Sequence, residues 1–244
     1  AFGLAGVDTL EDEGRVARWA REQGLAAPLQ VVNDSELVLA AGTPEGWGVA
    51  LAAGTGSVCL GRHADGRFAR VGGWGYLLGD EGSGYQVALR ALRVATQTAD
   101  GRADARELLQ AVLRHWSLPT AAALIAHVYA PNVTQADVAS LAAVVLDLAA
   151  QGDPSARAII DEAALELARH VDAAARQLGL TRPPLALAGG LLRPPLRQAV
   201  LAAVRSELGP VDYVTDPPLG AVVLARRLLA PVGRTETAPS FLRL

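Results

Sequence analysis

The chain has 244 residues, of which 51% are hydrophobic and 19% are charged, and its formal net charge is -3 at pH 7. This composition is typical of a soluble globular protein, and the length suffices for one large domain or two smaller ones. Because the net charge is slightly negative, we expect no broad basic surface that could bind the phosphate backbone of a nucleic acid. This excludes nucleic acid as a partner.

The single cysteine, Cys59, excludes an internal disulfide and any iron-sulfur or zinc cluster held by cysteines of this chain alone. Apolar runs are shorter than the roughly 18 residues that cross a bilayer. The first residues lack the basic-then-apolar pattern of a signal peptide. We therefore expect a cytoplasmic protein with no membrane partner.

The N-terminal elements begin with apolar residues at helical spacing, which predict an amphipathic helix over 9–23. A short buried strand is expected over 29–33 and a helix over 35–42. Asp34 lies at their junction, where backbone N–H groups and the helix dipole favour a carboxylate. It is interpreted either as the N-cap or as a base that removes a proton from an attacking hydroxyl.

Three strands follow, over 47–54, 57–62 and 67–71, and the sequence HADG between the last two predicts a hairpin turn. The next segment, GGWGYLLGDEGSGY over 72–85, contains too many glycines for a regular element. Ordering such a loop costs chain entropy, so it needs a structural or functional reason.

The remaining elements are read from apolar spacing and from breaks at Gly, Pro and Asp. Helices are expected over 84–99, 104–116, 119–128, 134–150 and 154–178. A strand over 184–190, a helix over 194–208, a strand over 211–215 and a closing helix over 219–230 come next, and 231–244 has the composition of a tail.

The turn between the first two of the three expected strands has two interpretations. It consists of Gly54, Thr55, Gly56 and Ser57. Its backbone N–H groups and hydroxyls could converge on a phosphate, because glycine allows close approach of the backbone. A tight hairpin without a ligand is the alternative. The chain contains no lysine, so this is not the glycine-rich loop that ends in Lys before a helix.

Two further segments carry candidate binding groups. Asp80 and Glu81 lie in the glycine-rich loop, where they could recognise sugar hydroxyls, hold a metal or cap the helix that begins near Ser83. Gly189 and Gly190 end a buried strand, where they could admit a nucleoside or form only a strand-to-helix turn.

Histidines and aromatic residues give weaker signals. The histidines have no metal-ligand spacing and are interpreted as structural or solvated; they are His63, His115, His127 and His170. Trp47, Trp74 and Tyr85 could stack on a sugar, although burial is the usual fate of aromatic residues.

Taken in order, the segments VVNDSELVLAAG, GVALAAGTGSVCLG, GGWGYLLGDEGSGY, LALAGG and LGAVVLA resemble the N-acetylglucosamine kinase branch of the BadF/BadG/BcrA/BcrD ATPase family. That family is part of the actin, sugar kinase and Hsp70-like superfamily. The likeness runs from about Val31 to Ala230. The lone Cys59 does not match relatives that carry an iron-sulfur cluster, and the zinc motif of the repressor and kinase sugar family is missing too.

The resemblance implies an α/β, ribonuclease-H-like, actin-like ATPase fold of two lobes. Residues 1–45 with the closing helix 219–230 would form an incomplete first lobe. Residues 46–218 would form the second lobe, with a large helical insertion over 84–178. The family's first phosphate-binding hairpin would lie upstream of Ala1, so we expect a preceding segment that carries it.

The resemblance also implies ATP-dependent phosphorylation of the 6-hydroxyl of an amino sugar, N-acetylglucosamine or glucosamine, with Mg²⁺. Asp34 would be the catalytic base. Gly54, Thr55, Gly56 and Ser57 would bind phosphate, and Gly189 and Gly190 would bind adenosine. The sugar would be held by Asn33, Thr55, Gly72, Gly73, Trp74, Asp80 and Glu81.

Two functional hypotheses remain open at this stage. The first is the sugar kinase. The second is a sugar-binding or regulatory protein of the same fold that transfers no phosphate, because it lacks the first phosphate-binding loop. The partners are an amino sugar and ATP in the first case, and the resemblance also allows a homodimer formed through the helical lobe.

Overall fold

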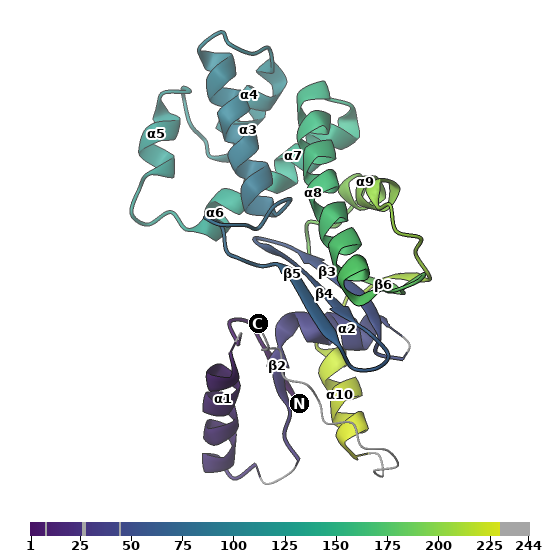
Figure 1. The fold of residues 1–244 in the computed structure, drawn as a ribbon. Helices are drawn as coiled ribbons and strands as arrows, with labels where there is room; N and C mark the ends of the chain where they lie inside the picture. Colours follow the sequence, from purple (N-terminus) through teal and green to yellow (C-terminus); the bar gives the residue numbers. More distant parts are fainter. Residues whose placement is uncertain (8, 26–27, 44, 230–244) are drawn as a thin grey trace.

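The computed structural model describes residues 1–7, 9–25, 28–43 and 45–229. Its helices and strands alternate along the chain, with one long helical block between two groups of strands (Figure 1). In chain order they are β1 (Phe2–Leu4), α1 (Leu10–Glu22), β2 (Val31–Asn33), α2 (Asp34–Gly42), β3 (Gly48–Ala53), β4 (Ser57–Arg62), β5 (Phe68–Gly72), α3 (Gly84–Ala99), α4 (Arg106–His115), α5 (Ala123–Val128), α6 (Gln135–Ala139), α7 (Leu141–Gln151), α8 (Pro154–Leu178), β6 (Leu185–Ala188), α9 (Leu196–Ala203), β7 (Val211–Tyr213) and α10 (Leu219–Leu229).

A five-stranded mixed sheet with the order β5-β4-β3-β6-β7 forms the centre of the molecule. Strand β3 pairs antiparallel with β4 and parallel with β6. All four residues of β6 and nearly all of β3 are buried, as expected for central strands covered on both faces. The register places Ala53 opposite Ser57, so the β3–β4 turn lies at the carboxyl end of β3, beside the carboxyl end of β6.

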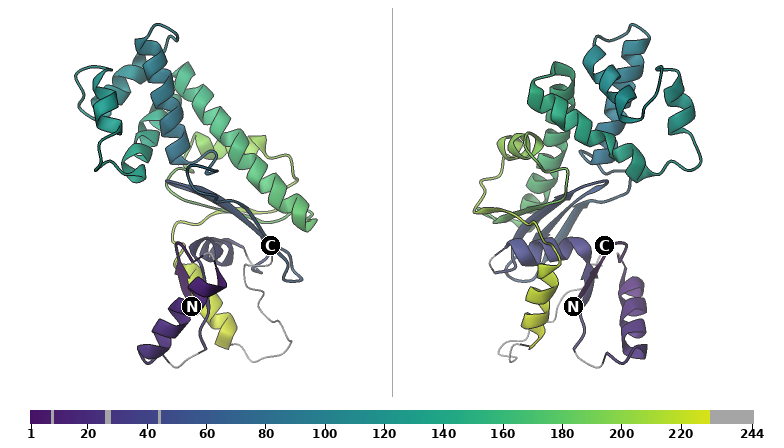
Figure 2. Two further views of the ribbon diagram at one scale, coloured as in Figure 1. Left: turned by 60° about the vertical axis from the view of Figure 1, so that its left-hand side comes forward. Right: turned by 180° about the vertical axis from the view of Figure 1, so that it is seen from behind.

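Helices cover both faces of this sheet. Helix α8 lies along one face against β3, β4 and β5, and α2 lies on the other face against β3 and β6, as two further views show (Figure 2). A Cβ at Gly42 would lie 2.6 Å from the side chains of Ala186 and Val214, so glycine permits the close packing of α2 on the sheet.

Helix α2 also contacts the smaller part of the molecule, which contains α1, the parallel pair β1–β2 and α10 (Figure 1). Helix α10 packs on α2 where Gly220 approaches the carbonyl group of Leu37 so closely that a Cβ would overlap it. Helix α1 begins with a capping box in which the side chains and backbones of Thr9 and Asp12 exchange hydrogen bonds.

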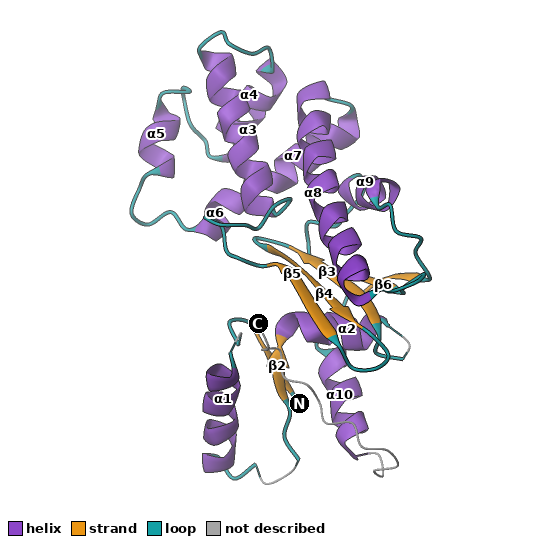
Figure 3. Ribbon diagram, in the orientation of Figure 1, coloured by secondary structure: helices purple, strands orange, loops and turns teal. Residues whose placement is uncertain are grey.

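The main hydrophobic core lies between the sheet and the helical block formed by α3, α4, α7 and α8 (Figure 3). Helix α8 starts as expected from its sequence, with Asp153 as the N-cap and Pro154 as the first helical residue. Its buried face includes Ile160, Leu167 and Val171. This block fixes the position of α3, whose first residue borders the glycine turns described below.

Most predicted elements are confirmed, but four differ. Strand β1 was not predicted, the helix expected over 119–128 begins only at Ala123, and the helix expected over 134–150 is divided at Ser140 into α6 and α7. The helix expected over 194–208 ends at Ala203. Val204 is extended, and the backbone N–H groups of Arg205 and Ser206 donate to the carboxylate of Asp172 on α8. This tertiary contact replaces the last helical turns.

The expected division into 1–45 with 219–230 and 46–218 stays a prediction, and residues 231–244 lie outside the described part of the chain. No helix within the described ranges combines the length and apolar character needed to cross a membrane.

Candidate active site

The turn Gly54–Ser57 joins β3 to β4 and is attached to the start of α3. Within it, the Gly54 N–H donates to the carbonyl oxygen of Gly56 at 2.9 Å. The carbonyl oxygens of Gly54 and Thr55 accept from the N–H groups of Gly84 and Tyr85, at 2.8 and 3.2 Å. Backbone donors at the first turn of α3 are thereby satisfied by the hairpin turn, which holds the two segments together.

The glycine-rich loop reaches the same turn through Asp80 and Glu81. The Asp80 carboxylate accepts a hydrogen bond from the Ser57 N–H at 3.3 Å, and the Ser57 hydroxyl donates to the Glu81 carbonyl oxygen at 2.9 Å. A Cβ at Gly56 would lie only 3.0 Å from the Asp80 carboxylate. Glycine at position 56 therefore lets a carboxylate lie directly against the turn.

The capping interpretation of Asp80 and Glu81 is wrong. Ser83 is the N-cap of α3, and its hydroxyl accepts a hydrogen bond from the Gln86 N–H. Asp80 instead adopts a left-handed backbone conformation with φ of 56°, which aims its carboxylate at Ser57.

The pair Gly189–Gly190 follows β6 and lies beside the end of β3. Gly189 has φ of 105°, and a Cβ there would overlap the carbonyl oxygen of Ala53. The same oxygen accepts from the Leu191 N–H at 3.2 Å, and the Gly189 carbonyl oxygen accepts from the Tyr213 hydroxyl at 3.0 Å. The glycine pair is thus fixed directly next to the hairpin turn.

These glycine segments border one pocket of about 380 Å³. Its wall combines Gly54, Thr55, Gly84 and Gly190 with residues of α6 and α7 that are mostly alanine. Arg193, which lies 3.8 Å from Asp147, also borders it. Small side chains leave room for a flat ligand, and the backbone of the glycine turns is exposed to it.

Asn33 and Asp34 lie at the N-terminus of α2. Asn33 is the N-cap, because its side-chain oxygen accepts from the Ser35 N–H at 3.0 Å, so the interpretation of Asp34 as the cap is wrong. Asp34 is the first helical residue and its side chain is exposed. Within the described part of the chain, the structure records no hydrogen bond or ion pair that links Asp34 to the Gly54–Ser57 turn.

Two residues further on, the same helix carries a half-buried carboxyl group, that of Glu36. Burial raises the pKa of Glu36 from its ordinary value of 4.5 to about 8, although the positive charge of Arg62 lowers it in part. Glu36 is therefore largely protonated at neutral pH.

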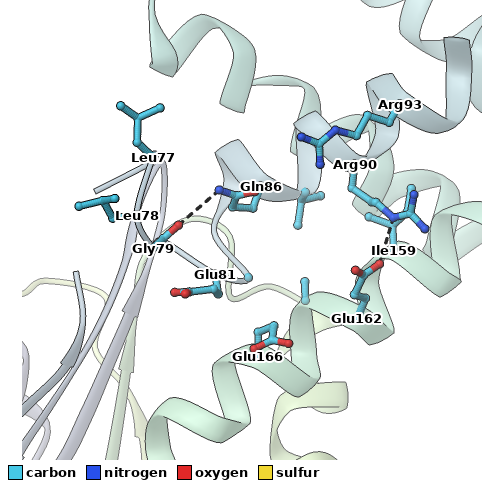
Figure 4. Close-up of a pocket in the computed structure, with 13 residues that line it drawn as sticks. Leu77, Leu78, Gly79, Glu81, Gln86, Arg90, Arg93, Ile159, Glu162 and Glu166 are labelled. Carbon is cyan, nitrogen blue, oxygen red and sulfur yellow. Dashed lines mark hydrogen bonds and ion pairs between the residues drawn. The ribbon is translucent and has the colours of Figure 1, made fainter. Parts of the chain in front are cut away.

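The other predicted sugar-binding residues, Gly72, Gly73 and Trp74, open the glycine-rich loop. Both glycines have positive φ, and the Trp74 side chain is 66% exposed. Gln86 of α3 anchors the loop by donating to the carbonyl oxygens of Tyr76 and Gly79, the second of which is drawn in Figure 4.

Of the remaining aromatic candidates, Tyr85 packs edge-on against Tyr76, with ring centroids 5.4 Å apart. The Trp47 indole donates to Glu45. Cys59 is buried in β4, and burial raises the pKa of its thiol. Among the described residues, no cluster of three or more His, Cys, Asp or Glu side chains is arranged to hold a metal ion.

His170, interpreted from its spacing as structural or solvated, has its Nε2 atom 3.6 Å from the Glu81 carboxylate. The two residues come from α8 and from the glycine-rich loop, far apart in the chain. Neither metal-ligand spacing nor a motif marks His170, so only the packing of the loop on α8 identifies it.

Comparisons with known proteins agree with this architecture. The chain is 37% identical over 192 residues to an N-acetylmuramic acid/N-acetylglucosamine kinase of Clostridium acetobutylicum, covering 78% of this chain and 63% of that protein. It is 32% identical over 239 residues to an N-acetyl-D-glucosamine kinase of Dictyostelium discoideum, and the match covers 92% of this chain and 74% of that protein. The chain thus spans less than two thirds of the length of the first of these relatives.

Solved structures with a similar fold include a chain from Chromobacterium violaceum assigned as an N-acetylglucosamine kinase, with a TM-score of 0.63 and 30% identity over 91% of this chain and 73% of that one. A chain from Porphyromonas gingivalis, at 20% identity and a TM-score of 0.63, covers 90% of this chain and 74% of its own and supports the fold alone.

The expected α/β, ribonuclease-H-like fold is confirmed by these neighbours and by the mixed sheet with helices on both faces. The sequence profile of the BadF/BadG/BcrA/BcrD ATPase family matches residues 1–225. The chain therefore belongs to the BadF/BadG/BcrA/BcrD ATPase family.

Proposed function

We propose that this protein is a sugar kinase that transfers the γ-phosphate of ATP to the 6-hydroxyl of an amino sugar, N-acetylglucosamine or glucosamine. One observation carries the proposal: the Gly54–Ser57 turn is hydrogen-bonded to the Asp80–Glu81 segment, and Ala53, the residue directly before the turn, lies against Gly189. A phosphate turn held between a carboxylate-bearing loop and a nucleoside-sized pocket suits transfer from a nucleotide to a hydroxyl. The names of the two relatives support the amino-sugar substrate.

In this proposal the nucleotide lies along the glycine segments. Gly54, Thr55, Gly56 and Ser57 bind its phosphates, and Gly189 with Gly190 accepts the adenosine. The alanine-lined pocket beside Gly190 supports this placement, because small side chains leave space for a planar base.

The sugar lies on the side of the turn that faces the glycine-rich loop. Asp80 and Glu81 supply carboxylates for hydroxyl recognition, and exposed Trp74 supplies a ring face. The complete proposed set is Asn33, Thr55, Gly72, Gly73, Trp74, Asp80 and Glu81.

Asp34 is proposed as the base that takes the proton from the sugar 6-hydroxyl as its oxygen attacks the γ-phosphate. An exposed carboxylate in the first turn of a helix is accessible to a ligand, as a base must be. The reaction needs alignment and charge neutralisation more than covalent chemistry, so positioned backbone groups and one base supply much of it.

Mg²⁺ is part of the proposal as the ion that neutralises the phosphate charge. Mg²⁺ usually binds through one or two carboxylates together with phosphates and water, so it needs no cage made entirely of protein groups. The Asp80 carboxylate beside the turn is an oxygen donor of the required kind. Chelation by EDTA should abolish turnover, and added Mg²⁺ should restore it.

The test is sugar-dependent ADP release by the full-length protein, measured with N-acetylglucosamine, glucosamine, N-acetylmuramic acid and glucose. We expect an amino sugar to raise ADP release well above the sugar-free rate. Calorimetry with sugar and with Mg-ATP separates the alternative, since a sugar-binding or regulatory protein would bind sugar without turnover. A cytoplasmic location, where ATP is available, and a homodimer stay predictions.

A further inference from the structure

The glycine-rich loop lies on a single stripe of α8. A Cβ at Gly82 would lie 2.6 Å from the Ala163 carbonyl oxygen and from the Leu167 side chain, and a Cβ at Gly72 would lie 2.5 Å from Nε2 of His170. Residues 163, 167 and 170 follow helical spacing and share one face of α8. Both ends of the loop therefore touch the same face of α8. His170 is the polar residue among the three that make this contact.

The orientation of the His170 ring is fixed. Its side chain is only 8% exposed, and its Nδ1 atom lies 2.8 Å from the carbonyl oxygen of Glu166. A carbonyl oxygen accepts and never donates, so Nδ1 carries the proton of this hydrogen bond. The other nitrogen, Nε2, consequently faces the loop.

Nε2 faces the carboxylate of Glu81 at 3.6 Å, an ion-pair distance when the ring carries its second proton. It is the ion pair that the described part of the chain records for Glu81, and the neighbouring cation on α8, Arg169, pairs with Glu166 instead. A second pocket, of about 380 Å³, is lined by Glu81 and Glu166, and within it Arg90 pairs with Glu162 (Figure 4). The Glu81 side chain is 47% exposed, so it can contact a ligand while His170 restrains it.

The Glu81 backbone is held separately. Its carbonyl oxygen accepts from the hydroxyl of Ser57, the last residue of the phosphate turn. Glu81 is thus restrained at two points, by the turn through its backbone and, when the His170 ring carries both protons, by α8 through its carboxylate. A carboxylate restrained in this way loses less conformational freedom when it binds a sugar hydroxyl.

We propose that His170 is a positioning residue for sugar recognition, which acts by holding the Glu81 carboxylate in its binding orientation. Gly72 serves the same arrangement by leaving space for the imidazole. The inference rests on the proposed function and adds to it a residue from outside the glycine motifs.

Three variants at position 170 separate positioning from packing. His170→Asn keeps a donor for the Glu166 carbonyl oxygen but does not reach Glu81, His170→Gln places an amide near the position of Nε2, and His170→Leu keeps only bulk. We expect His170→Asn and His170→Leu to raise the KM for the sugar about tenfold, with kcat and the KM for ATP unchanged within twofold. His170→Gln should stay within about threefold of the wild type.

A double-mutant cycle with Glu81→Gln provides the second readout. Glu81→Gln and His170→Asn should each raise the sugar KM, and the double variant should be no worse than Glu81→Gln alone. The matched control is His63→Asn, which removes a histidine–carboxylate pair with Asp65 in the β4–β5 turn and should leave the sugar KM unchanged.

The possible results are distinguishable. With an active wild-type protein, an unchanged sugar KM in His170→Asn, an equal rise in the KM for ATP, or additive effects in the double variant would overturn the role of His170 alone. A wild-type protein that turns over no sugar would overturn the proposed function, and the role of His170 with it. Thermal unfolding of each variant identifies losses that come from misfolding.

Discussion

Gly189 lies so close to Ala53 that a Cβ at position 189 would overlap the Ala53 carbonyl oxygen. This contact joins the carboxyl ends of two parallel strands, β3 and β6, at the place where each continues into a glycine turn. It brings the proposed adenosine segment against the proposed phosphate turn. The two turns can therefore lie this close together only because residue 189 is a glycine, which has no Cβ.

Replacing Gly189 with alanine should damage both stability and nucleotide binding. The overlap with Ala53 and the φ of 105° together predict a loss of about 2–4 kcal/mol in the free energy of unfolding, measured by chemical denaturation. We also expect the KM for ATP to rise in any folded fraction.

Gly190→Ala is the stability control for this change, because a Cβ at Gly190 would meet no atom within 4 Å. It should leave the free energy of unfolding within about 0.5 kcal/mol of the wild type. Equal stabilities of the two variants would contradict the account of the β3–β6 contact.

Removing the Ser57 hydroxyl should loosen the glycine-rich loop. Ser57→Ala leaves the Glu81 carbonyl oxygen without its donor, so we expect a loss of about 1 kcal/mol in stability and a higher KM for the sugar. Thr96→Ala removes an exposed hydroxyl that donates to the Arg93 carbonyl oxygen of the same helix, and it should change neither quantity appreciably. A Ser57→Ala protein with wild-type stability and sugar KM would show that this hydrogen bond does not hold the loop.

Asp34→Asn should reduce kcat strongly and leave the fold intact. Loss of a general base typically costs about 10²–10⁴ in rate, whereas the exposed Asp34 side chain makes no recorded contact that stabilises the described part of the chain. Calorimetry should show sugar binding close to that of the wild type. Glu11→Gln, which changes another exposed first-turn carboxylate, is the control with unchanged kcat. A kcat within tenfold of the wild type in Asp34→Asn would remove Asp34 from the role of base.

Glu36 should make the protein less stable as the pH rises. Because its pKa is about 8 in the folded state and near 4.5 when unfolded, the folded protein holds a proton that the unfolded chain has lost between these values. Its contribution to stability is complete below about pH 4.5 and is lost as the pH rises toward 8. Thermal unfolding of Glu36→Gln should show a flatter dependence on pH over this range and a higher Tm than the wild type at pH 8. Parallel pH curves for the two proteins would contradict the protonated state of Glu36 in the folded protein.

Local patterns predicted much of the fold because many boundaries are set by neighbouring residues. Asp153 and Pro154 start α8 where expected, and the HADG turn joins β4 to β5. The errors lie where contacts between residues far apart in the sequence determine whether an element forms or where it ends. Helix α9 stops early because Asp172 binds the backbone of Arg205 and Ser206, and β1 forms only by pairing with β2.

The candidate site shows the same division. The Gly54–Ser57 turn and the Asp80–Glu81 segment are visible as motifs, since their glycines reflect local backbone requirements. The part played by Ser57 in joining them, and the approach of His170 to Glu81, arise from how the loop packs on α8. Both interpretations of a helix cap were also wrong: Asn33 caps α2 in place of Asp34, and Ser83 caps α3 in place of the pair Asp80–Glu81.

The most direct test of the central claim is the chemical identity of the product. The full-length protein is incubated with Mg-ATP and N-acetylglucosamine or glucosamine, and the product is examined by two-dimensional ³¹P–¹H NMR. The account predicts a new phosphate ester whose phosphorus couples to the two protons on carbon 6 of the sugar. Inorganic phosphate as the only new phosphorus signal besides ADP, or an ester at another carbon, would contradict it.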